Sequence, residues 1–461
     1  MNGDLGIVGR MTDAHMLRIV FGSVLLVVGG LWLISLPVGA LAGDFWSLRG
    51  SLIYGAGVLA LSSMSLAVIL ASRPVLIEGL LGGLDKFYRL HKWFAIAGVA
   101  FAVTHWSLEV VPRTLVRQGW MTRPGRPAAP AETLVSAGFD PFRDLAGLAV
   151  QLGEWSLYLV LALAALALWK WFPYRAFLKT HRLMPALYLV LVFHAVILID
   201  RTYWTAPLGP VLALLMLGGV SAAMTALLRR TGASRRVAGR IRRLTPYAGN
   251  AMLDVEVQLE TAWPGHQAGQ FAFLNLGGVE GAHPFTIASA WRRDGRLTFS
   301  IKGLGDYTRL LPDRLFVDQA VAVEGPYGRF DFREAPSRQV WIAGGVGITP
   351  FIARLQALAD ERKRMGQAGA VDLVYSTNTP DEAFIDQIRQ LAVKAGVRFH
   401  LLVAPRDGLL TLDRLASWIP DWKAAGIWFC GPTPFGRALR KAMTASGMLP
   451  AHFHQEFFEM R

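Results

Sequence analysis

Cysteine is almost absent from this chain. Its 461 residues include one cysteine, Cys430, and show neither an internal repeat nor a low-complexity stretch. One cysteine excludes a disulfide framework and a four-cysteine iron–sulfur cluster within the chain. Any metal must therefore be held mainly by histidine, aspartate or glutamate.

The N-terminus also lacks the marks of a cleavable signal. Residues 1–18 (MNGDLGIVGRMTDAHMLR) do not follow the basic, apolar and small-residue order of a signal peptide, and a long apolar run comes next. We therefore expect that run to be retained as a first membrane span.

Long apolar runs are abundant in the first half. Apolar residues make up 53% of the chain, and they concentrate before residue 229. Six stretches are long enough to cross a bilayer. They are residues 16–40, 51–71, 91–111, 153–172, 181–199 and 207–228.

The positive charge follows membrane topology. The net charge is +14, and seven arginines lie in residues 229–243, directly after the sixth run. The connectors 72–90 and 170–180 are also basic, so the positive-inside rule places both termini in the cytoplasm and makes nucleic-acid binding the weaker explanation. The arginine-containing loop 112–150 disagrees, but the rule gives long loops little weight. We expect a multi-pass membrane protein.

Two of the apolar runs each carry two histidines. His91 and His105 are 14 residues apart, and His181 and His194 are 13 apart. At about 1.5 Å of rise per residue, each spacing covers roughly 20 Å, most of a hydrocarbon core. Bis-imidazole binding of two stacked haems needs this layout. The alternative is that these histidines only pack between helices. The presence of two matched pairs argues against that alternative.

The spacing of 13 needs an explanation. On a straight helix, 14 residues return to within about 40° of the starting face, whereas 13 residues end roughly 140° away. Pro185 cannot donate a hydrogen bond to the carbonyl of His181, so the sequence predicts a distorted helix at this point.

The second half reads as two folded parts. Short alternating runs after residue 240 (MLDVEVQLE, QFAFLNL, RLTFSIKG, QAVAVEG) predict a small antiparallel barrel. From about residue 338, strands alternate with helices, as in QVWIAGG followed by VGITPFIARLQALADERKR, and this order predicts a parallel sheet.

The segment HPFTIAS, residues 283–289, has the side chains that a flavin requires. Phe285 could stack on the flavin ring, Thr286 or Ser289 could bond N5, and His283 could meet the pyrophosphate. Two later segments strengthen this interpretation. They are GLGDYTRLL (303–311), a glycine turn whose amides and Thr308 could meet phosphates, and EGPYGRF (324–330).

Two turns predict a nucleotide site. GGVGITPF, residues 344–351, follows an apolar strand and opens a helix, so its backbone can approach a pyrophosphate. CGP, residues 430–432, follows the strand GIWF. Cys430 could lie near a nicotinamide or be a small buried residue. In the terminal FHQEFFEMR, an aromatic residue could cover the flavin or belong to the core.

HPFTIAS, GDYT, GPYG, GGVGITPF and CGP, in this order, resemble the ferredoxin–NADP reductase superfamily. With six spans and four histidines, nearly the whole chain resembles the ferric reductase and NADPH oxidase family. The segments LHKWFAIAGVAFAVTHW and THRLMPALYLVLVFH keep that family's spacings of 14 and 13. The ending FHQEFFEMR is similar to that of bacterial ferric reductases within the family.

The resemblance implies cofactors and the residues that bind them. His91 and His181 would bind an inner b-type haem, and His105 and His194 an outer one. The FAD contacts would be His283, Pro284, Phe285, Thr286, Ser289, Gly305 and Thr308. The contacts to NADPH or NADH would be Gly344, Gly345, Gly347, Thr349, Pro350, Cys430, Gly431 and Pro432. The residues at the reacting atoms would be Thr286, Cys430, Glu456 and Phe457.

The expected fold is a six-helix transmembrane haem domain (1–228), a basic linker (229–240), an antiparallel β-barrel FAD domain (241–336) and an α/β parallel-sheet nucleotide-binding domain (337–461). The expected activity is electron transfer from cytoplasmic NAD(P)H through FAD and two haems to an outer acceptor. That acceptor could be a ferric chelate, dioxygen, a quinone or a periplasmic partner protein.

Three positions depart from the family pattern or leave it open. Glu109 stands where animal NADPH oxidases have a further histidine, which argues against efficient superoxide production. Arg49 could match an arginine near the outer haem or lie at the membrane interface. The turn STNTPDEAF (376–384) opens without an arginine and Arg406 is distant, so NADH and NADPH stay open.

Two other functions fit part of the sequence. A membrane-tethered flavin reductase would use a cytoplasmic acceptor and keep the histidines as structural residues. A non-enzymatic haem-binding membrane protein would leave the flavin and nucleotide motifs unexplained.

Overall fold

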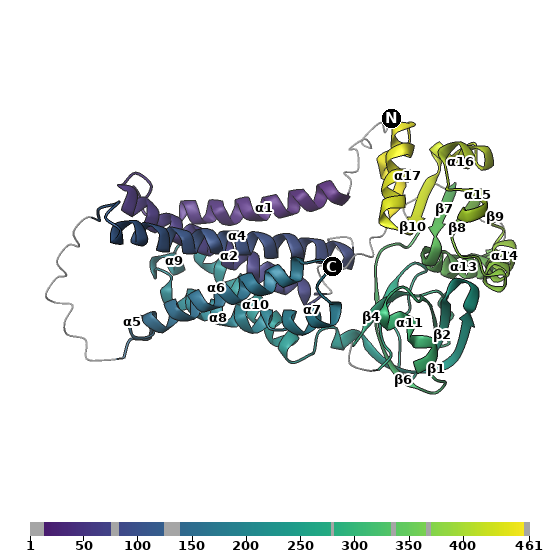
Figure 1. Ribbon diagram of the computed structural model, residues 1–461, viewed down its shortest axis with the longest axis horizontal. Helices are drawn as coiled ribbons and strands as arrows, with labels where there is room; N and C mark the ends of the chain where they lie inside the picture. Colours follow the sequence, from purple (N-terminus) through teal and green to yellow (C-terminus); the bar gives the residue numbers. More distant parts are fainter. Residues whose placement is uncertain are drawn as a thin grey trace, which may run out of the picture. The chain divides into compact units, whose positions relative to one another are not determined.

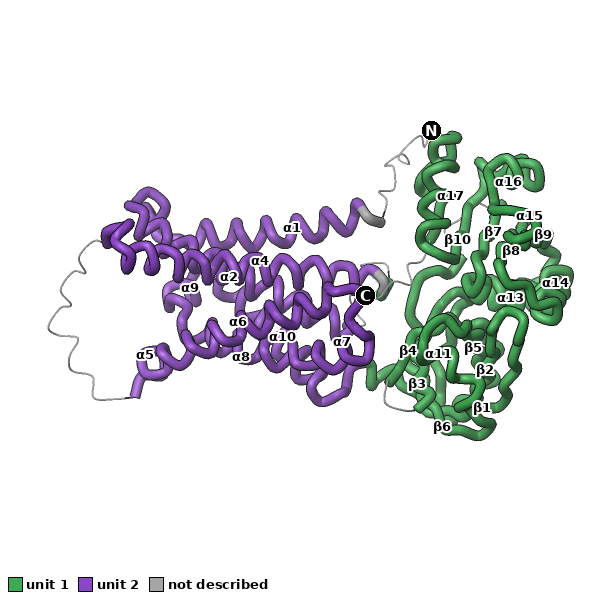
Figure 2. The backbone as a smooth tube through the Cα atoms, viewed as in Figure 1, with its two compact units in different colours: residues 1–12, 82–85, 232–461 green, residues 13–81, 86–231 purple. Residues whose placement is uncertain are grey.

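The computed structural model describes residues 13–74, 83–123, 139–277, 281–332, 338–365 and 370–455. The chain divides into two units (Figure 2). The first, here called the helical unit, comprises residues 13–81 and 86–231. The second, here called the α/β unit, is built mainly from residues 232–461.

The helical unit is a bundle of long apolar helices (Figure 1). Within the described ranges, six segments are long and apolar enough to cross a membrane, as predicted. The helices of this unit are α1 (Asp13–Ile34), α2 (Phe45–Ala71), α4 (Leu84–Arg117), α5 (Pro141–Asp144), α6 (Ala146–Leu168), α7 (Tyr174–His181), α8 (Met184–Leu198), α9 (Thr202–Thr205) and α10 (Leu208–Leu227).

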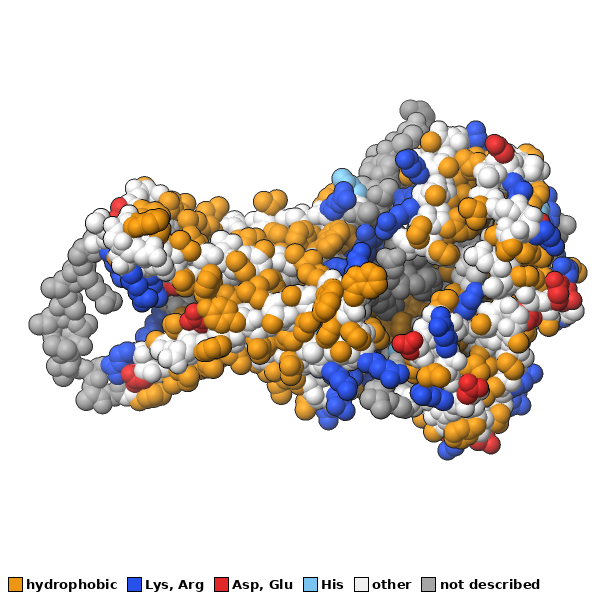
Figure 3. Space-filling model, viewed as in Figure 1, with side chains coloured by type: hydrophobic (Ala, Val, Ile, Leu, Met, Phe, Trp, Pro, Cys, Tyr) orange, Lys and Arg blue, Asp and Glu red, His pale blue; other side chains and the backbone are white. Residues whose placement is uncertain are grey.

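Large apolar side chains cover much of the visible surface of this bundle (Figure 3). Leu26, Trp155 and Leu214 are at least 70% exposed. Such a surface is unfavourable in water and suits lipid. The interior is held by α2, α8 and α10, where the Tyr188 and Ser65 hydroxyls share a hydrogen bond of 2.8 Å.

Several helical spans differ from their predicted extents. α1 ends at Ile34, before the predicted residue 40, and α2 and α6 begin at Phe45 and Ala146, before the predicted residues 51 and 153. α4 runs from Leu84 to Arg117, well past the predicted 91–111. The fifth span is broken, because α7 ends at His181 and α8 begins at Met184, with Pro185 in its first turn. This break agrees with the distortion expected from Pro185.

The first part of the α/β unit is the predicted antiparallel barrel. Its strand order is β4-β3-β6-β1-β2-β5, and a bridge between Ile287 and Phe299 links the two end strands. β1 begins at Arg236, inside the stretch expected to be a linker. The strands are β1 (Arg236–Tyr247), β2 (Met252–Leu259), β3 (Phe271–Asn275), β4 (His283–Thr286), β5 (Arg296–Lys302) and β6 (Ala320–Tyr327), and the short helices α11 (Asp306–Arg309) and α12 (Leu311–Arg314) follow β5.

The second part is the predicted parallel sheet, in the order β11-β10-β7-β8-β9. Along β7, Trp341 and Ala343 pack on the face covered by α13 and α14, while Val340 and Ile342 pack on the face covered by α16 and α17. The elements are β7 (Gln339–Gly344), α13 (Thr349–Met365), β8 (Val371–Thr377), α14 (Glu382–Ala395), β9 (Arg398–Val403), α15 (Ala404–Asp407), α16 (Leu412–Trp418), β10 (Gly426–Cys430), α17 (Thr433–Ala445) and β11 (Phe453–Gln455).

Candidate electron-transfer sites

The four histidines of the helical unit form two facing pairs. The ring centres of His91 and His181 are 6.1 Å apart, and those of His105 and His194 are 6.2 Å apart. The ring planes cross at 77° and 83°. In each pair, one imidazole comes from α4 and the other from the broken fifth span.

The separation suits a metal held between two imidazoles. Metal–imidazole bonds are about 2 Å long and each ring centre lies about 1 Å beyond its coordinating nitrogen, which gives roughly 6 Å between centres. If the rings only packed against each other, nothing would require the same separation of ring centres in both pairs. Two imidazoles from different helices are also a donor set that could hold a haem iron.

Backbone carbonyls orient three of the four rings. The Nδ1 atoms of His91, His105 and His194 each lie 2.8 Å from a carbonyl oxygen, of Ala67, Ile53 and Ala149 respectively. A ring that donates through Nδ1 presents Nε2 to a metal, which is the usual arrangement around bound metals. The Nδ1 atom of His181 is buried without a hydrogen-bond partner among the described residues.

Two glycines let the outer pair approach the neighbouring helices. Gly57 lies one turn after Ile53, and a Cβ there would be 3.1 Å from Nδ1 of His105. Gly153 lies one turn after Ala149, and a Cβ there would collide with the His194 ring. The His194 imidazole therefore reaches its carbonyl only because residue 153 has no side chain, whereas a side chain at residue 57 would crowd the His105 ring. Neither glycine was predicted as a site residue, because glycines are common in apolar helices and these carry no motif.

The flavin segment HPFT forms β4, the end strand of the barrel sheet. Its backbone pairs with β3, where Phe285 faces Ala272 and Thr286 faces Phe271, and Pro284 pairs with Phe273. Thr286 is buried. The His283 ring stacks on Tyr307 of α11 with centres 4.1 Å apart, so the strand and the glycine turn are adjacent.

Two hydroxyls expected to meet FAD already have local partners. The Ser289 hydroxyl accepts a hydrogen bond from the Thr298 amide at 3.0 Å. The Thr308 hydroxyl accepts from the amides of Leu304 and Gly305, at 3.0 and 3.1 Å. Thr308 thus closes the turn before α11. Of the two hydroxyls proposed for flavin N5, Thr286 is left as the better candidate.

The two predicted nucleotide turns lie against each other. A Cβ at Gly347 would collide with the Cys430 carbonyl, and one at Gly344 would be 2.8 Å from Cδ of Pro432 and 3.4 Å from Cα of Gly431. Only glycine permits this approach of the loops that follow β7 and β10. Gly345, with φ of +57°, makes the turn, and Thr349 and Pro350 open α13.

The remaining predicted residues near the reacting atoms are only partly described. The Cys430 side chain is 1% exposed and belongs to the core cluster that contains Phe351 and Trp428. Glu456 and Phe457 lie outside the described residues. β11 brings the chain to Gln455, and it pairs with β10 beside Phe429.

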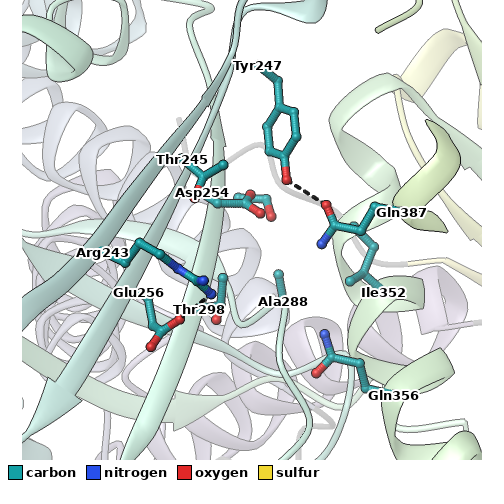
Figure 4. Close-up of a pocket in the computed structure, with 11 residues that line it drawn as sticks. Arg243, Thr245, Tyr247, Asp254, Glu256, Ala288, Thr298, Ile352, Gln356 and Gln387 are labelled. Carbon is teal, nitrogen blue, oxygen red and sulfur yellow. Dashed lines mark hydrogen bonds and ion pairs between the residues drawn. The ribbon is translucent and has the colours of Figure 1, made fainter. Parts of the chain in front are cut away.

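A polar cavity of about 310 Å³ lies between the barrel and the helices α13 and α14 (Figure 4). The Tyr247 hydroxyl donates a 2.5 Å hydrogen bond to Gln387, and burial raises the pKa of Tyr247 to about 12. Burial also raises the pKa of the Asp254 carboxyl. The lining residues belong mainly to β1, β2, β5, α13 and α14, so the cavity marks the seam between the two parts of this unit.

A cation lies near the turn after β8, whose own first residues include no arginine. The Lys302 amino group, at the end of β5, is 3.5 Å from the Thr379 hydroxyl. Arg406 is paired with its neighbour Asp407. The signal for Lys302 was a basic residue directly before the GLG turn, but its partner came from a segment far away in sequence.

These features define a class. The chain is a multi-pass membrane protein that carries an FAD- and NAD(P)H-binding oxidoreductase module. Residues 56–192 match the family described as ferric reductase like transmembrane component, and residues 240–331 match an FAD-binding domain family. In this order, they give the chain the domain architecture of the ferric reductase and NADPH oxidase family, as its motifs predicted.

Several relatives are electron-transfer components. The ferredoxin–NAD(+) reductase component of the alkene monooxygenase system of Xanthobacter autotrophicus is 33% identical over 36% of this chain and 53% of that protein. The propane 2-monooxygenase reductase component of Rhodococcus jostii is 27% identical over 45% of this chain and 60% of that protein. The chain thus spans about half of each relative's length.

Among solved structures, the flavohem-like FAD/NAD binding domain of nitric oxide dioxygenase from Vibrio cholerae is similar, with a TM-score of 0.41 and 23% identity. The match covers 48% of this chain and 98% of that structure.

Proposed function

We propose that this protein carries electrons across a bacterial inner membrane, from cytoplasmic NAD(P)H through FAD and two b-type haems to an acceptor on the outer face. The observation that carries the proposal is the repeated pair of facing imidazoles at 6.1 and 6.2 Å. We also propose the domain division, with haem binding in residues 1–228 and nucleotide binding in 337–461. The FAD-binding barrel, predicted as 241–336, would begin at Arg236, which shortens the linker predicted at 229–240.

The residues take roles that follow from their positions. His91 and His181 would hold the inner haem, and His105 and His194 the outer one. When bound, FAD supplies the conversion of a two-electron hydride donor into a one-electron donor. Two imidazoles would hold each haem iron and leave it no place for the acceptor, so the haem would supply one-electron transfer without binding the acceptor.

In the α/β unit, Phe285 would stack on the flavin ring and Thr286 would hydrogen-bond its N5 edge. The abutting turns at Gly344–Pro350 and Cys430–Pro432 would bind the nucleotide, whose pyrophosphate suits the amides that open α13. Lys302, whose amino group is near the Thr379 hydroxyl, would meet the ribose end of the same nucleotide.

Absorption spectroscopy of the purified protein tests the proposal. Under anaerobic conditions, NADPH or NADH should bleach the flavin and then produce reduced b-type haem bands, with two haems per FAD. His105→Ala should abolish reduction of an external acceptor and spare hydride transfer to FAD, whereas His15→Ala, a substitution in α1, should behave as wild type. A yellow protein without haem bands would instead indicate a tethered flavin reductase.

A further inference from the structure

The chain that follows the flavin strand β4 connects the barrel to α13. We call residues 287–292 the linking segment. Its Ala290 amide donates to Oε1 of Gln356 at 3.1 Å, and Nε of Arg292 donates to the Asp360 carboxylate at 2.8 Å. Gln356 and Asp360 are four residues apart on α13, so they lie on the same face of that helix. The linking segment is therefore bonded to α13 at two points.

The barrel holds the linking segment from its other side. The Ala288 amide donates to the Thr298 carbonyl at 2.7 Å, and the Ser289 hydroxyl accepts from the Thr298 amide at 3.0 Å. Nε2 of His266 donates to the Ser289 carbonyl at 2.8 Å. Because these bonds begin two residues after β4 ends, a shift of the linking segment would be passed on to the flavin strand.

The bond to Gln356 is the stronger of the two connections to α13. Ala290 is 8% exposed, and a buried backbone amide is costly to leave without an acceptor. The Arg292 and Asp360 side chains are 54% and 29% exposed, so water and salt weaken their attraction. We therefore expect the glutamine, and not the ion pair, to fix α13 against the linking segment.

α13 also carries the proposed nucleotide turn at its start. Thr349 opens the helix, and Gln356 follows it by seven residues, which is about two turns and about 10 Å of rise. Residues seven apart lie on the same face of a helix. The face of α13 that begins at the nucleotide turn is therefore the face that Gln356 bonds to the linking segment.

Side chains do not fill the whole seam between the barrel and these helices. Gln356 and Gln387 both line the polar cavity of about 310 Å³ that lies there (Figure 4). Both also bond across the seam, Gln356 to the Ala290 amide and Gln387 to the Tyr247 hydroxyl. In this region the orientation of α13 therefore depends on individual hydrogen bonds more than on close packing.

We infer that Gln356 is a positioning residue for hydride transfer from NAD(P)H to FAD. Through the Ala290 amide, it would hold the nucleotide turn of α13 at a fixed distance from the flavin strand. This inference rests on the proposed binding of both cofactors to the α/β unit. Hydride transfer needs its two reacting atoms about 3–3.5 Å apart, and a misplacement of about 1 Å can slow a reaction about a hundredfold.

The step is balanced by the two cofactors alone. The C4–H bond of NAD(P)H breaks, the hydrogen leaves with both electrons and forms a bond to N5 of FAD, and NAD(P)+ is the other product. Gln356 is not proposed to touch either reacting atom. It would change the rate of this transfer and not the affinity for the nucleotide, because the residues proposed to bind the nucleotide are unchanged.

The test replaces Gln356 by methionine in the full-length protein, which keeps the length of the side chain and removes the acceptor. The nucleotide is the one of NADPH and NADH that the wild type oxidises faster. In anaerobic stopped-flow absorption, the limiting rate of flavin bleaching should fall about tenfold, with the Kd of the nucleotide within about twofold of wild type. FAD per protein should stay the same. Hydrogen–deuterium exchange of the Ala290 amide, a readout independent of activity, should become faster.

Three further variants complete the test. Gln319→Met is the matched control, because Oε1 of Gln319 accepts the Phe316 amide at 3.3 Å within the barrel. It should change neither the bleaching rate nor the exchange at Ala290. Gln356→Glu retains an acceptor oxygen and should bring the rate to within about threefold of wild type. If Gln356→Met does not fold, Gln356→Ser gives the same comparison, since its hydroxyl is too short to reach the Ala290 amide.

Three results would overturn the inference. The first is a limiting rate in Gln356→Met equal to that of the wild type. The second is a fall in rate matched by loss of FAD or of nucleotide affinity, which would indicate a purely structural role. The third is a Gln356→Glu protein as slow as Gln356→Met. In all three cases the wild-type flavin is still bleached by the nucleotide. A wild-type flavin that neither NADPH nor NADH bleaches would instead contradict the proposed function itself.

Discussion

At the residue scale, glycines of the helical unit determine how closely the facing imidazole rings can approach the neighbouring helix. The His194 imidazole bonds the Ala149 carbonyl across the position that a side chain at residue 153 would fill. The same relation holds for His105, Ile53 and Gly57. Orientation of the ring by a carbonyl thus depends on glycine one turn further along the facing helix.

Gly153→Ala should therefore displace His194 and disturb the outer haem. We expect bound haem to fall from two towards one per FAD, because the added Cβ collides with the ring. The pyridine haemochrome assay measures this ratio. Gly147→Ala is the matched control on α6, since a Cβ there would meet no described atom within 4 Å. Full haem content in Gly153→Ala would show that the ring is held otherwise.

A second residue-scale prediction concerns a buried carboxylate of the parallel sheet. Asp372 is fully buried and accepts from Arg338 at 2.5 Å, Arg398 at 2.7 Å and His400 at 2.8 Å. Burial alone would raise its pKa, but these three donors outweigh burial and lower the pKa to about 2. Because its ordinary value is 3.8, this stabilisation is complete above about pH 4 and is lost as the pH falls through about 2.

Asp372→Asn should lower the free energy of unfolding near neutral pH by about 2 kcal/mol, since it weakens the buried acceptor of Arg338, Arg398 and His400, while Arg338 keeps its pair with Asp421. It should also remove the part of the acid dependence that lies between about pH 4 and pH 2. Thermal unfolding at several pH values measures both effects. Asp386→Asn, which breaks the exposed pair with Arg389, should change little. Equal effects of both substitutions would refute the argument.

At the element scale, the broken fifth span resolves the odd histidine spacing. Because α7 ends at His181 and α8 begins at Met184, the rotation expected for a straight helix does not apply between His181 and His194. Pro185 accounts for the break, as its ring cannot follow a continuous helix and it lacks the donor for the His181 carbonyl.

Pro185→Ala should allow α7 and α8 to join and turn His181 away from His91. We expect weakened inner-haem binding, seen as reduced haem per FAD and loss of one of two reduction steps in a potentiometric titration. Pro210→Ala is the control, since α10 carries no histidine. Two unchanged reduction steps would mean that packing, and not proline, fixes the break.

Much of the architecture could be predicted because its signals are local. Alternation gave the barrel strands, and the strand–glycine–helix order gave the parallel sheet. The limits of α4 could not be predicted, since Glu109, Arg113 and Arg117 are charged yet helical. Nor could the partners of Lys302 or the carbonyls that orient the histidines, because these contacts join segments far apart in sequence.

At the scale of the whole molecule, the proposed path requires the two ends of the helical unit to face different compartments. Donors oxidised by the α/β unit would be cytoplasmic, and the end of the helical unit with His105 and His194 would face outside. The single native cysteine makes this testable, because Cys430 is 1% exposed and should react poorly with a thiol reagent.

Cysteines introduced at two exposed positions should report opposite sides. Gln118 comes directly after α4, and Ser234 lies in the 3-10 helix before β1. In spheroplasts, a membrane-impermeant maleimide should label Gln118→Cys at once and Ser234→Cys only after permeabilisation. Both should react equally in detergent, which controls for exposure. The reverse pattern would place the flavin unit outside, where NAD(P)H is not supplied, and would contradict the proposed direction of electron flow.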